Sequence, residues 1–251
     1  TTLHALMPHR VVLHTHPIDL LGVILRKNGR EILSKILKND SWAWIPYTKP
    51  GIDLTRLVQK VVAKQKVDIL ILANHGLVVG GKDCDTAFSL MDRIVNSVRA
   101  KPLRVNYFQN KIKLKKLERE ILHARLPKFD EIHSLALDKI SYECCNCESG
   151  VLYPDQAVFL GPVVACYDGE MSGKDILNYI NNNKISNFII LKKIGVLILE
   201  KKRNELDEML LFHARMLMCI DNSHDIRYLK KDEVNELINW ESEKYRQNLG
   251  K

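Results

Sequence analysis

The chain has 251 residues, of which 46% are hydrophobic and 27% are charged, and this composition is typical of a folded globular protein rather than a disordered or fibrous one. Its apolar stretches are far shorter than the roughly 20 residues that span a membrane, and the first residues lack the pattern of a secretory signal. We therefore expect a cytoplasmic protein that does not associate with membranes.

Basic residues exceed acidic ones, 38 against 30, which gives a net charge of +8. Part of the excess lies in the run from Lys111 to Lys116, where Leu114, Leu117 and Ile121 recur at helical spacing. This spacing favours the solvated face of a helix over a nucleic-acid site. We expect no nucleic-acid partner.

Half of the six cysteines, Cys144, Cys145 and Cys147, lie within four residues of one another. A zinc ribbon or finger needs two separated ligand pairs, which the remaining cysteines do not supply. Disulfides are uncommon in the cytosol. The sequence leaves the role of this cysteine cluster open.

The first hundred residues alternate between strand and helix patterns. Buried strands appear as short β-branched or apolar runs, and helices as apolar residues at offsets of 3, 4 and 7. Asp83 or Asp85 is available to cap the last of these helices. The expected elements are strands at 10–16, 42–47, 67–73 and 77–79, and helices at 18–27, 54–62 and 87–98.

A similar strand, turn, strand and helix pattern recurs 119 positions later, at 188–191, 195–199 and from about residue 204. In this alignment Gly76 corresponds to Gly195, and His75 to Ile194. A weaker match relates 7–13 to 153–159. It would place Leu160 and Pro162 where the first copy has His14 and His16. The second half is therefore interpreted as a degenerate repeat that lacks the histidines, although short apolar windows also match by chance.

A boundary is expected near Pro127, where polar residues follow the basic helix. It divides the chain into a domain at 1–125 and a C-terminal α/β region at 126–251. A final amphipathic helix is expected at 229–246.

Three histidines form the candidate metal site. His14 and His16 are two residues apart on an expected strand, so that both side chains lie on the same face. His75 lies in a turn, followed by Gly76. Three imidazoles around an open position are typical of catalytic zinc. A His-x-His pair alone is more often structural, and that alternative stays open on spacing alone.

The two segments around these histidines resemble the class II aldolase and adducin family. The similar stretches run from Pro8 to Pro17 and from Leu70 to Gly81, with 59 positions between His16 and His75. More loosely, the C-terminal half is similar to the aldolase part of bifunctional rhamnulose-phosphate aldolase and alcohol dehydrogenase proteins. No glycine-rich dinucleotide fingerprint is present.

The resemblance implies a three-layer α/β/α fold with a mainly antiparallel central sheet, plus the smaller C-terminal region. It implies Zn²⁺, or another divalent transition metal, held by His14, His16 and His75. The implied reaction is retro-aldol cleavage of a small phosphorylated ketose or a related hydroxy-carbonyl compound through a metal-stabilised enediolate. It also implies a homo-oligomer.

The resemblance leaves the catalytic and substrate-binding residues unassigned. In the family, the acid/base glutamate and the phosphate-binding loops precede the segment that matches Thr1 to His4. The expectation is therefore either a longer native protein or an incomplete enzyme. Other polar residues near the site receive no role: His4, His9, Asp19, Tyr47 and Lys49. A sugar-phosphate epimerase on the same site and a non-catalytic adducin-like binding module remain the alternatives.

Overall fold

The computed structural model describes residues 2–99, 110–147, 150–185, 187–199 and 205–239. The chain forms two compact units. Unit 1 comprises residues 1–101, 152–154 and 225–251, and unit 2 comprises residues 102–151 and 155–224. The sequence-continuous domains 1–125 and 126–251 differ from these units and stay a prediction.

Unit 1 contains a four-stranded sheet with the order β1-β4-β3-β2. β1 pairs antiparallel with β4, and β4 antiparallel with β3, whereas β2 pairs parallel with β3 because helix α4 connects them as a crossover. Each strand falls within or close to its expected range. The strands are β1 (Val11–Thr15), β2 (Trp42–Ile45), β3 (Ile69–Leu72) and β4 (Gly76–Gly81).

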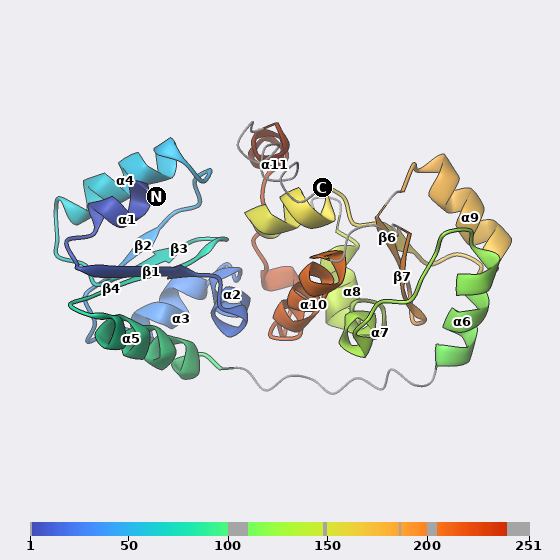
Figure 1. Ribbon diagram of the computed structural model, residues 1–251, viewed down its shortest axis with the longest axis horizontal. Helices are drawn as coiled ribbons and strands as arrows, with labels where there is room; N and C mark the ends of the chain where they lie inside the picture. Colours follow the sequence, from blue (N-terminus) through green and yellow to red (C-terminus); the bar gives the residue numbers. More distant parts are fainter. Residues whose placement is uncertain (1, 100–109, 148–149, 186, 200–204, 240–251) are drawn as a thin grey trace. The chain divides into compact units, whose positions relative to one another are not determined.

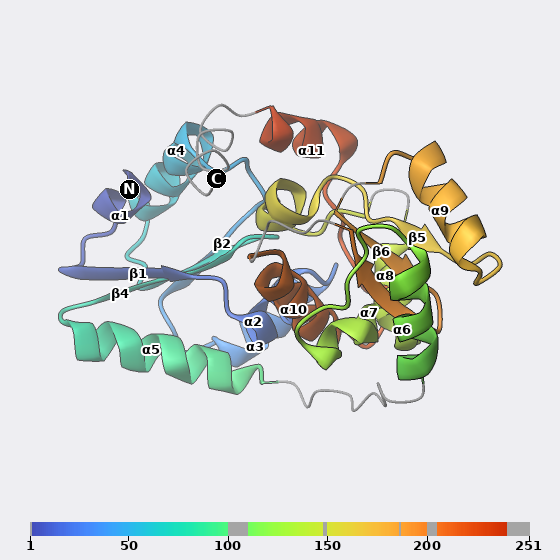
Figure 2. The ribbon, with the colours of Figure 1, turned by 45° about the vertical axis from the view of Figure 1, so that its right-hand side comes forward.

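Helices cover both faces of this sheet (Figures 1 and 2). On one side lie α1 (Thr2–Leu6) and α4 (Ile52–Val62), and on the other α2 (Ile18–Ile24), α3 (Gly29–Ile36) and α5 (Cys84–Ser97). The mixed α/β class expected from the sequence is confirmed. The aspartate that caps α5 is Asp83, whose side chain accepts a hydrogen bond from the backbone N–H of Thr86 at 2.8 Å.

The sequence predicted a helix at 18–27 and none at 29–36, whereas α2 ends at Ile24 and, after a break, α3 spans Gly29–Ile36. The break has a tertiary cause. The backbone N–H of Lys27 donates to the carbonyl of Asp225 at 2.7 Å, and Arg26 forms an antiparallel bridge with Ile226. The N–H of Lys27 and the carbonyl of Leu25 therefore pair with the C-terminal segment and not within a helix, whereas the N–H of Arg26 donates to the carbonyl of Val23.

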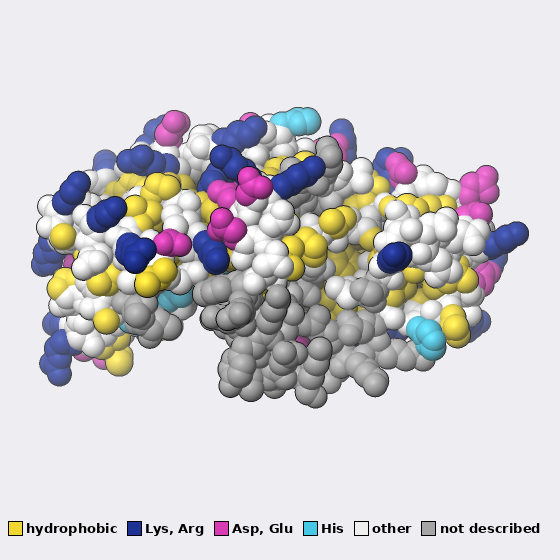
Figure 3. Space-filling model, turned by 90° about the horizontal axis from the view of Figure 1, so that it is seen from above, with side chains coloured by type: hydrophobic (Ala, Val, Ile, Leu, Met, Phe, Trp, Pro, Cys, Tyr) yellow, Lys and Arg dark blue, Asp and Glu magenta, His cyan; other side chains and the backbone are white. Residues whose placement is uncertain are grey.

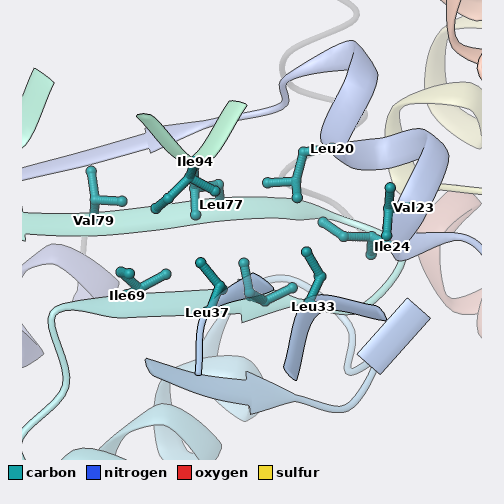
Figure 4. Packing of buried hydrophobic residues seen from close by; sticks show 10 residues of the cluster. Leu20, Val23, Ile24, Leu33, Leu37, Ile69, Leu77, Val79 and Ile94 are labelled. Atoms are coloured by element: carbon teal, nitrogen blue, oxygen red, sulfur yellow. The ribbon is translucent and has the colours of Figure 1, made fainter. Parts of the chain in front are cut away.

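The alternation of side chains along the buried β3 strand divides the core of unit 1 into two clusters. Leu70 and Leu72 contribute to the cluster under α4. Ile69 and Ile71 contribute to the cluster covered by α2, α3 and α5 (Figure 4). Because β3 is buried on both faces, its sequence is continuously apolar.

Unit 2 contains a three-stranded sheet in the order β5-β6-β7, with β5 and β6 parallel and β6 and β7 antiparallel. The strands are β5 (Cys166–Tyr167), β6 (Phe188–Leu191) and β7 (Gly195–Ile198). The α-helices are α6 (Lys111–Glu120), α7 (Ser134–Leu137), α8 (Lys139–Cys145), α9 (Gly173–Asn182) and α10 (Glu205–Leu217).

The strand pairs of the two units share one register. Leu72 pairs with Gly76 in unit 1, and Leu191 pairs with Gly195 in unit 2, in each case 119 positions later. The intervening turns also agree, because Asn74 and Lys193 both adopt positive φ, at 53° and 59°. A common origin by duplication stays a prediction.

The weaker match between 7–13 and 153–159 is not reflected in the same secondary structure. Residues Gln156–Leu160 form a short π-helix, whereas the corresponding part of unit 1 leads into strand β1. The side chain of Gln156 is buried and donates to the carbonyl of Gly150 at 2.6 Å, which holds this segment in a local turn. In the described part of unit 2, the sheet has no counterpart of β1.

The final helix is shorter than expected in the described region. Helix α11 spans Lys231–Ile238, and residues 240–246 of the expected helix lie outside the described residues. Within the described part of the chain, no helix has the length and apolar character needed to cross a membrane.

Candidate metal centre

The end of β1 and the β3–β4 turn bring the three histidines together. His14 lies on β1 opposite Val78, and His16 follows two residues later, which places both side chains on the same side of the strand. His75 immediately precedes β4, the strand that pairs with β1. The antiparallel register therefore places the His75 turn beside the end of β1.

The three imidazole rings form a nearly equilateral triangle. The ring centroids are 5.0 Å apart for His14 and His16, 5.1 Å for His14 and His75, and 5.0 Å for His16 and His75. One nitrogen from each ring lies within 4.8 Å of the others. Among the described residues, no other group of histidine, cysteine or acidic side chains meets that spacing. The expected three residues are thus the ones that the fold gathers.

A backbone carbonyl sets the orientation of His14. Its Nδ1 lies 2.9 Å from the carbonyl oxygen of Leu77, so that Nδ1 carries the proton and donates it. Nε2 then keeps its lone pair and lies 3.3 Å from Nε2 of His16. A carbonyl on the distal nitrogen is the usual second partner of a metal-ligating histidine, because it fixes both the tautomer and the ring plane.

Gly76 permits the close approach of the turn to β1. A Cβ atom at this position would lie 2.5 Å from the carbonyl oxygen of Thr15 and 2.7 Å from Cδ2 of His16. The first of these atoms belongs to the backbone and cannot move aside cheaply. Glycine is therefore required here by the packing of the turn against His16.

Asn74 fixes the turn from inside the protein. Its side chain is fully buried, and its backbone has a φ of 53°. The amide nitrogen donates to the carbonyls of Leu152 and Arg227, each at 2.8 Å, and the amide oxygen accepts from Nη1 of Arg227 at 2.8 Å. No sequence pattern predicts this role, because Arg227 is 153 positions away from Asn74 and no local pattern joins the two residues.

The segment that carries Arg227 is held on both sides. Its backbone N–H donates to the carbonyl of Leu25 at 2.8 Å, and its guanidinium lies 3.5 Å from Glu233 and 5.6 Å from the ring centre of Tyr47. Burial, followed by the charge of Glu233, raises the pKa of Tyr47 well above its usual range, although Arg227 opposes the shift. Tyr47 is therefore a neutral phenol in this cluster.

The other polar residues considered from the sequence lie elsewhere or keep structural contacts. His9 precedes β1 at the end opposite His14, and its Nε2 lies 2.8 Å from Asp68. Asp19 lies in the first turn of α2, His4 lies in α1, and Lys49 follows β2. Within the described residues, none of these side chains joins the group of metal-ligating atoms.

The cysteine cluster is a separate, buried feature of unit 2. Cys145 on α8 has its Sγ 3.7 Å from Nε2 of His213, and both side chains are buried. Desolvation raises the pKa of the Cys145 thiol and lowers the pKa of His213 to about 4. The pair is therefore a neutral thiol beside a neutral imidazole, which is unlike a reactive thiolate.

The donor set of the three histidines fits a divalent transition metal. Imidazole nitrogens suit zinc, copper, iron and nickel, whereas calcium and magnesium prefer oxygen ligands. Three histidine ligands leave coordination positions for water or substrate, as in catalytic zinc sites. The arrangement can therefore hold an ion that reacts with a bound oxygen compound.

Comparison with known proteins bears on the part of the chain that carries this site. Residues 1–101 match the family model described as the class II aldolase and adducin N-terminal domain. The Bacillus subtilis (strain 168) protein named "Uncharacterized oxidoreductase YuxG" is 33% identical over 89 residues. The match covers 35% of this chain and 13% of that protein, so that the chain spans only a small part of its length. No solved structure matches.

Proposed function

We propose that this protein is a metal-dependent, zinc-preferring lyase of the class II aldolase type, which cleaves a small phosphorylated ketose or a related hydroxy-carbonyl compound. The observation that carries the proposal is the convergence of His14, His16 and His75 within residues that match the class II aldolase and adducin domain. A purely structural role needs no such convergence of imidazole nitrogens.

The protein's own contribution to this chemistry is to orient ligands and to leave an accessible face. Leu77 fixes the His14 tautomer, Gly76 lets the turn approach His16, and Asn74 holds the turn that presents His75. When bound, a divalent ion supplies a Lewis acid for the carbonyl and hydroxyl oxygens of a ketose. The residues that move protons and bind the rest of the substrate are unassigned.

The finer features belong to the same proposal. We infer the rhamnulose-phosphate branch of the family, a three-layer aldolase-like domain at 1–125, a degenerate repeat at 126–251, cytoplasmic location and a homo-oligomer. The shared register of the two sheets supports the repeat. The oxidoreductase name belongs to the B. subtilis protein, of which this chain matches 13%.

Elemental analysis of the purified protein tests the metal site. We expect about one zinc or similar ion per chain, as three-histidine sites bind. The His14→Ala/His75→Ala variant should lose the ion, whereas His224→Ala, at an exposed histidine of unit 2, should keep it. A wild-type protein that cannot be loaded with zinc, manganese, cobalt or nickel would refute the proposal.

The reaction is tested separately on metal-loaded protein with a panel of phosphorylated ketoses. Release of an aldehyde that depends on His14 and His75 supports the lyase. Conversion to an isomeric sugar phosphate without aldehyde release would assign an epimerase instead. Full metal occupancy with no turnover of any ketose would favour a binding module on the same fold.

A further inference from the structure

The outer edge of strand β2 has the features of a second binding site. β2 is the last strand of the sheet in unit 1, with β3 on one side. Ile69 N–H donates to the carbonyl of Ser41, and Ala73 N–H donates to the carbonyl of Ile45. Because backbone groups alternate along a strand, those of Trp42 and Trp44 point away from β3. They present donors and acceptors at an open sheet edge.

A groove runs along this edge. Its floor is β2, one wall is α3 with Arg30 and Ser34, and the other wall is Lys60 of α4 together with Lys64 in the turn that follows. Its volume is about 660 Å³. The side chains of Trp42 and Trp44 are half-buried on the α3 side, where they contact the apolar cluster of that face. The edge is therefore flanked by helices above and below, which suits an extended chain rather than a broad protein surface.

The charged residues that line the groove are all basic. A second hollow of about 690 Å³ adjoins it through Lys64 and Gln65, at the end of α4. In the part of the chain that the structure describes, no aspartate or glutamate lines either hollow. Six lysines and arginines line the two hollows, and among the described residues none of the six forms an ion pair with a carboxylate. These residues are Arg10, Arg30, Lys60, Lys64, Lys66 and Lys82.

The surface on the α4 side of unit 1 shows the same excess. In Figure 3, Lys and Arg side chains surround apolar patches there, with few Asp or Glu side chains between them. Such a surface attracts an acidic partner and repels a basic one. The apolar patches and the two tryptophans also offer a contact area that a bare polyanion does not use.

From these observations we propose that the β2 edge binds an extended acidic segment of another protein, which adds a strand to the sheet. The segment's backbone pairs with the outward groups of Trp42 and Trp44. Its alternate side chains face opposite walls, with apolar residues against the tryptophans on the α3 side and acidic residues toward Lys60 and Lys64 on the α4 side. This site is distinct from the three histidines and does not depend on a metal.

A blocked heptapeptide that alternates Glu and Val is the probe. Two of the three tryptophans of the chain lie in the groove, so that binding changes the tryptophan emission directly. We expect saturable binding that weakens with added salt, and slower hydrogen exchange of the Trp42 and Trp44 amides in the complex. The His14→Ala/His75→Ala variant should bind the peptide equally well.

Two kinds of change distinguish strand addition from general electrostatic attraction: charge reversal on the protein, and N-methylation of the peptide backbone. Lys60→Glu/Lys64→Glu should weaken binding about tenfold or more. Lys111→Glu/Lys115→Glu, with the same spacing on exposed lysines of α6, should leave it unchanged. A peptide with alternate N-methylated amides, or one that alternates Lys and Val, should not bind.

Three results would overturn the proposal. One is the absence of peptide binding. Another is peptide binding that N-methylation of the peptide leaves intact. The same holds if a single-stranded RNA displaces the peptide and binds the protein more tightly than the peptide does. The third is a dimer in light scattering that Lys60→Glu/Lys64→Glu dissociates, which would assign the edge to a second copy of this chain.

Discussion

Asn74 shows how one side chain can link distant parts of the chain to the candidate site. Its side chain is fully buried, and its three hydrogen bonds satisfy both amide hydrogens and the carbonyl oxygen. Its positive φ is tolerated by asparagine more readily than by most residues. The residue that follows it is His75, so that the turn and this imidazole are oriented together.

Replacement of Asn74 by alanine should weaken both the fold and the site. Loss of these bonds leaves a half-buried guanidinium and two carbonyls with fewer partners, which costs about 2–4 kcal/mol. We expect lower stability in urea unfolding and at least tenfold weaker zinc binding. Lys193→Ala is the matched control, because Lys193 has the same φ in the corresponding turn of unit 2. Equal zinc affinity in Asn74→Ala and the wild type would contradict the positioning role.

Replacement of Gly76 by alanine should displace His16. The added methyl group would meet the carbonyl of Thr15 and the ring of His16 at distances that real structures do not tolerate. We expect the turn to shift and zinc affinity to fall about tenfold or more, which is the scale of losses from disturbed outer contacts of metal sites. Isothermal titration with zinc measures this. A crystal structure of the variant with the three rings unmoved would contradict it.

At the scale of elements, the first turn of α10 is held to the segment after α6 by a buried carboxylate. Asp207 is fully buried and lies 2.6 Å from Nη2 of Arg125, and it accepts from the backbone N–H of Lys128 at 2.7 Å. Burial raises the pKa of Asp207, but the bonds from Arg125 and Lys128 outweigh it, and the net pKa is lowered. This stabilisation is present above the usual carboxyl pKa and is lost as the pH falls through the lowered value.

The Arg125→Met variant should lose about 3–5 kcal/mol of stability at neutral pH, because it leaves a buried charge without its main partner. Chemical unfolding followed by circular dichroism measures the change. Arg215→Met is a matched control, since Arg215 pairs with Glu131 at the surface, and it should cost less than about 1 kcal/mol. Similar losses of stability in the two variants would show that burial of Asp207 does not determine how much the ion pair contributes to the free energy of unfolding.

At the scale of the whole molecule, the two units share the same strand-pairing register but have different residues in the turn between the paired strands. Unit 1 has His75 where unit 2 has Ile194. Two histidines of unit 2 are buried: His213 beside Cys145, and His133, whose Nδ1 accepts from the backbone N–H of Val196 at 3.1 Å. Desolvation lowers the pKa of both. Unit 1 also needs residues from three separate stretches of the chain.

The stability of unit 2 should decrease in mild acid. Because His213 has a pKa of about 4 in the folded state and near 6.5 when unfolded, the unfolded chain binds more protons between these values. Folding therefore loses on the order of 3 kcal/mol as the pH falls from 6.5 to 4. Unfolding curves at several pH values measure this. His213→Gln should reduce the dependence, and an unchanged pH profile in that variant would contradict the assignment.

A fragment of residues 1–125 should bind zinc more weakly than a chain ending at residue 239. The shorter fragment retains all three histidines but lacks Leu152 and Arg227, the partners of Asn74. Zinc titration of both fragments, with circular dichroism to confirm folding, tests the expectation. Full affinity in the short, folded fragment would support 1–125 as an independent domain.

The sequence by itself determined most of unit 1 and the members of the candidate site. Strand alternation, helical spacing and the His-x-His pair are local patterns, because each depends on neighbours within a few residues. The same reasoning aligned Gly76 with Gly195, and the shared strand register agrees with that alignment. The helix predicted at 18–27 runs past the end of α2 at Ile24, because the break depends on backbone bonds to residues near 225, and α3 was not predicted.

Only the tertiary structure decided what surrounds the histidines. The contacts of Asn74 with Leu152 and Arg227, the neutral Tyr47 beside that arginine, and the open edge of β2 between two helices all join residues remote in sequence. Hydrogen bonds and burial depend on distance in space, and neither composition nor periodicity encodes which remote segments meet. The sequence therefore named the three histidines, and the fold determined how they are held.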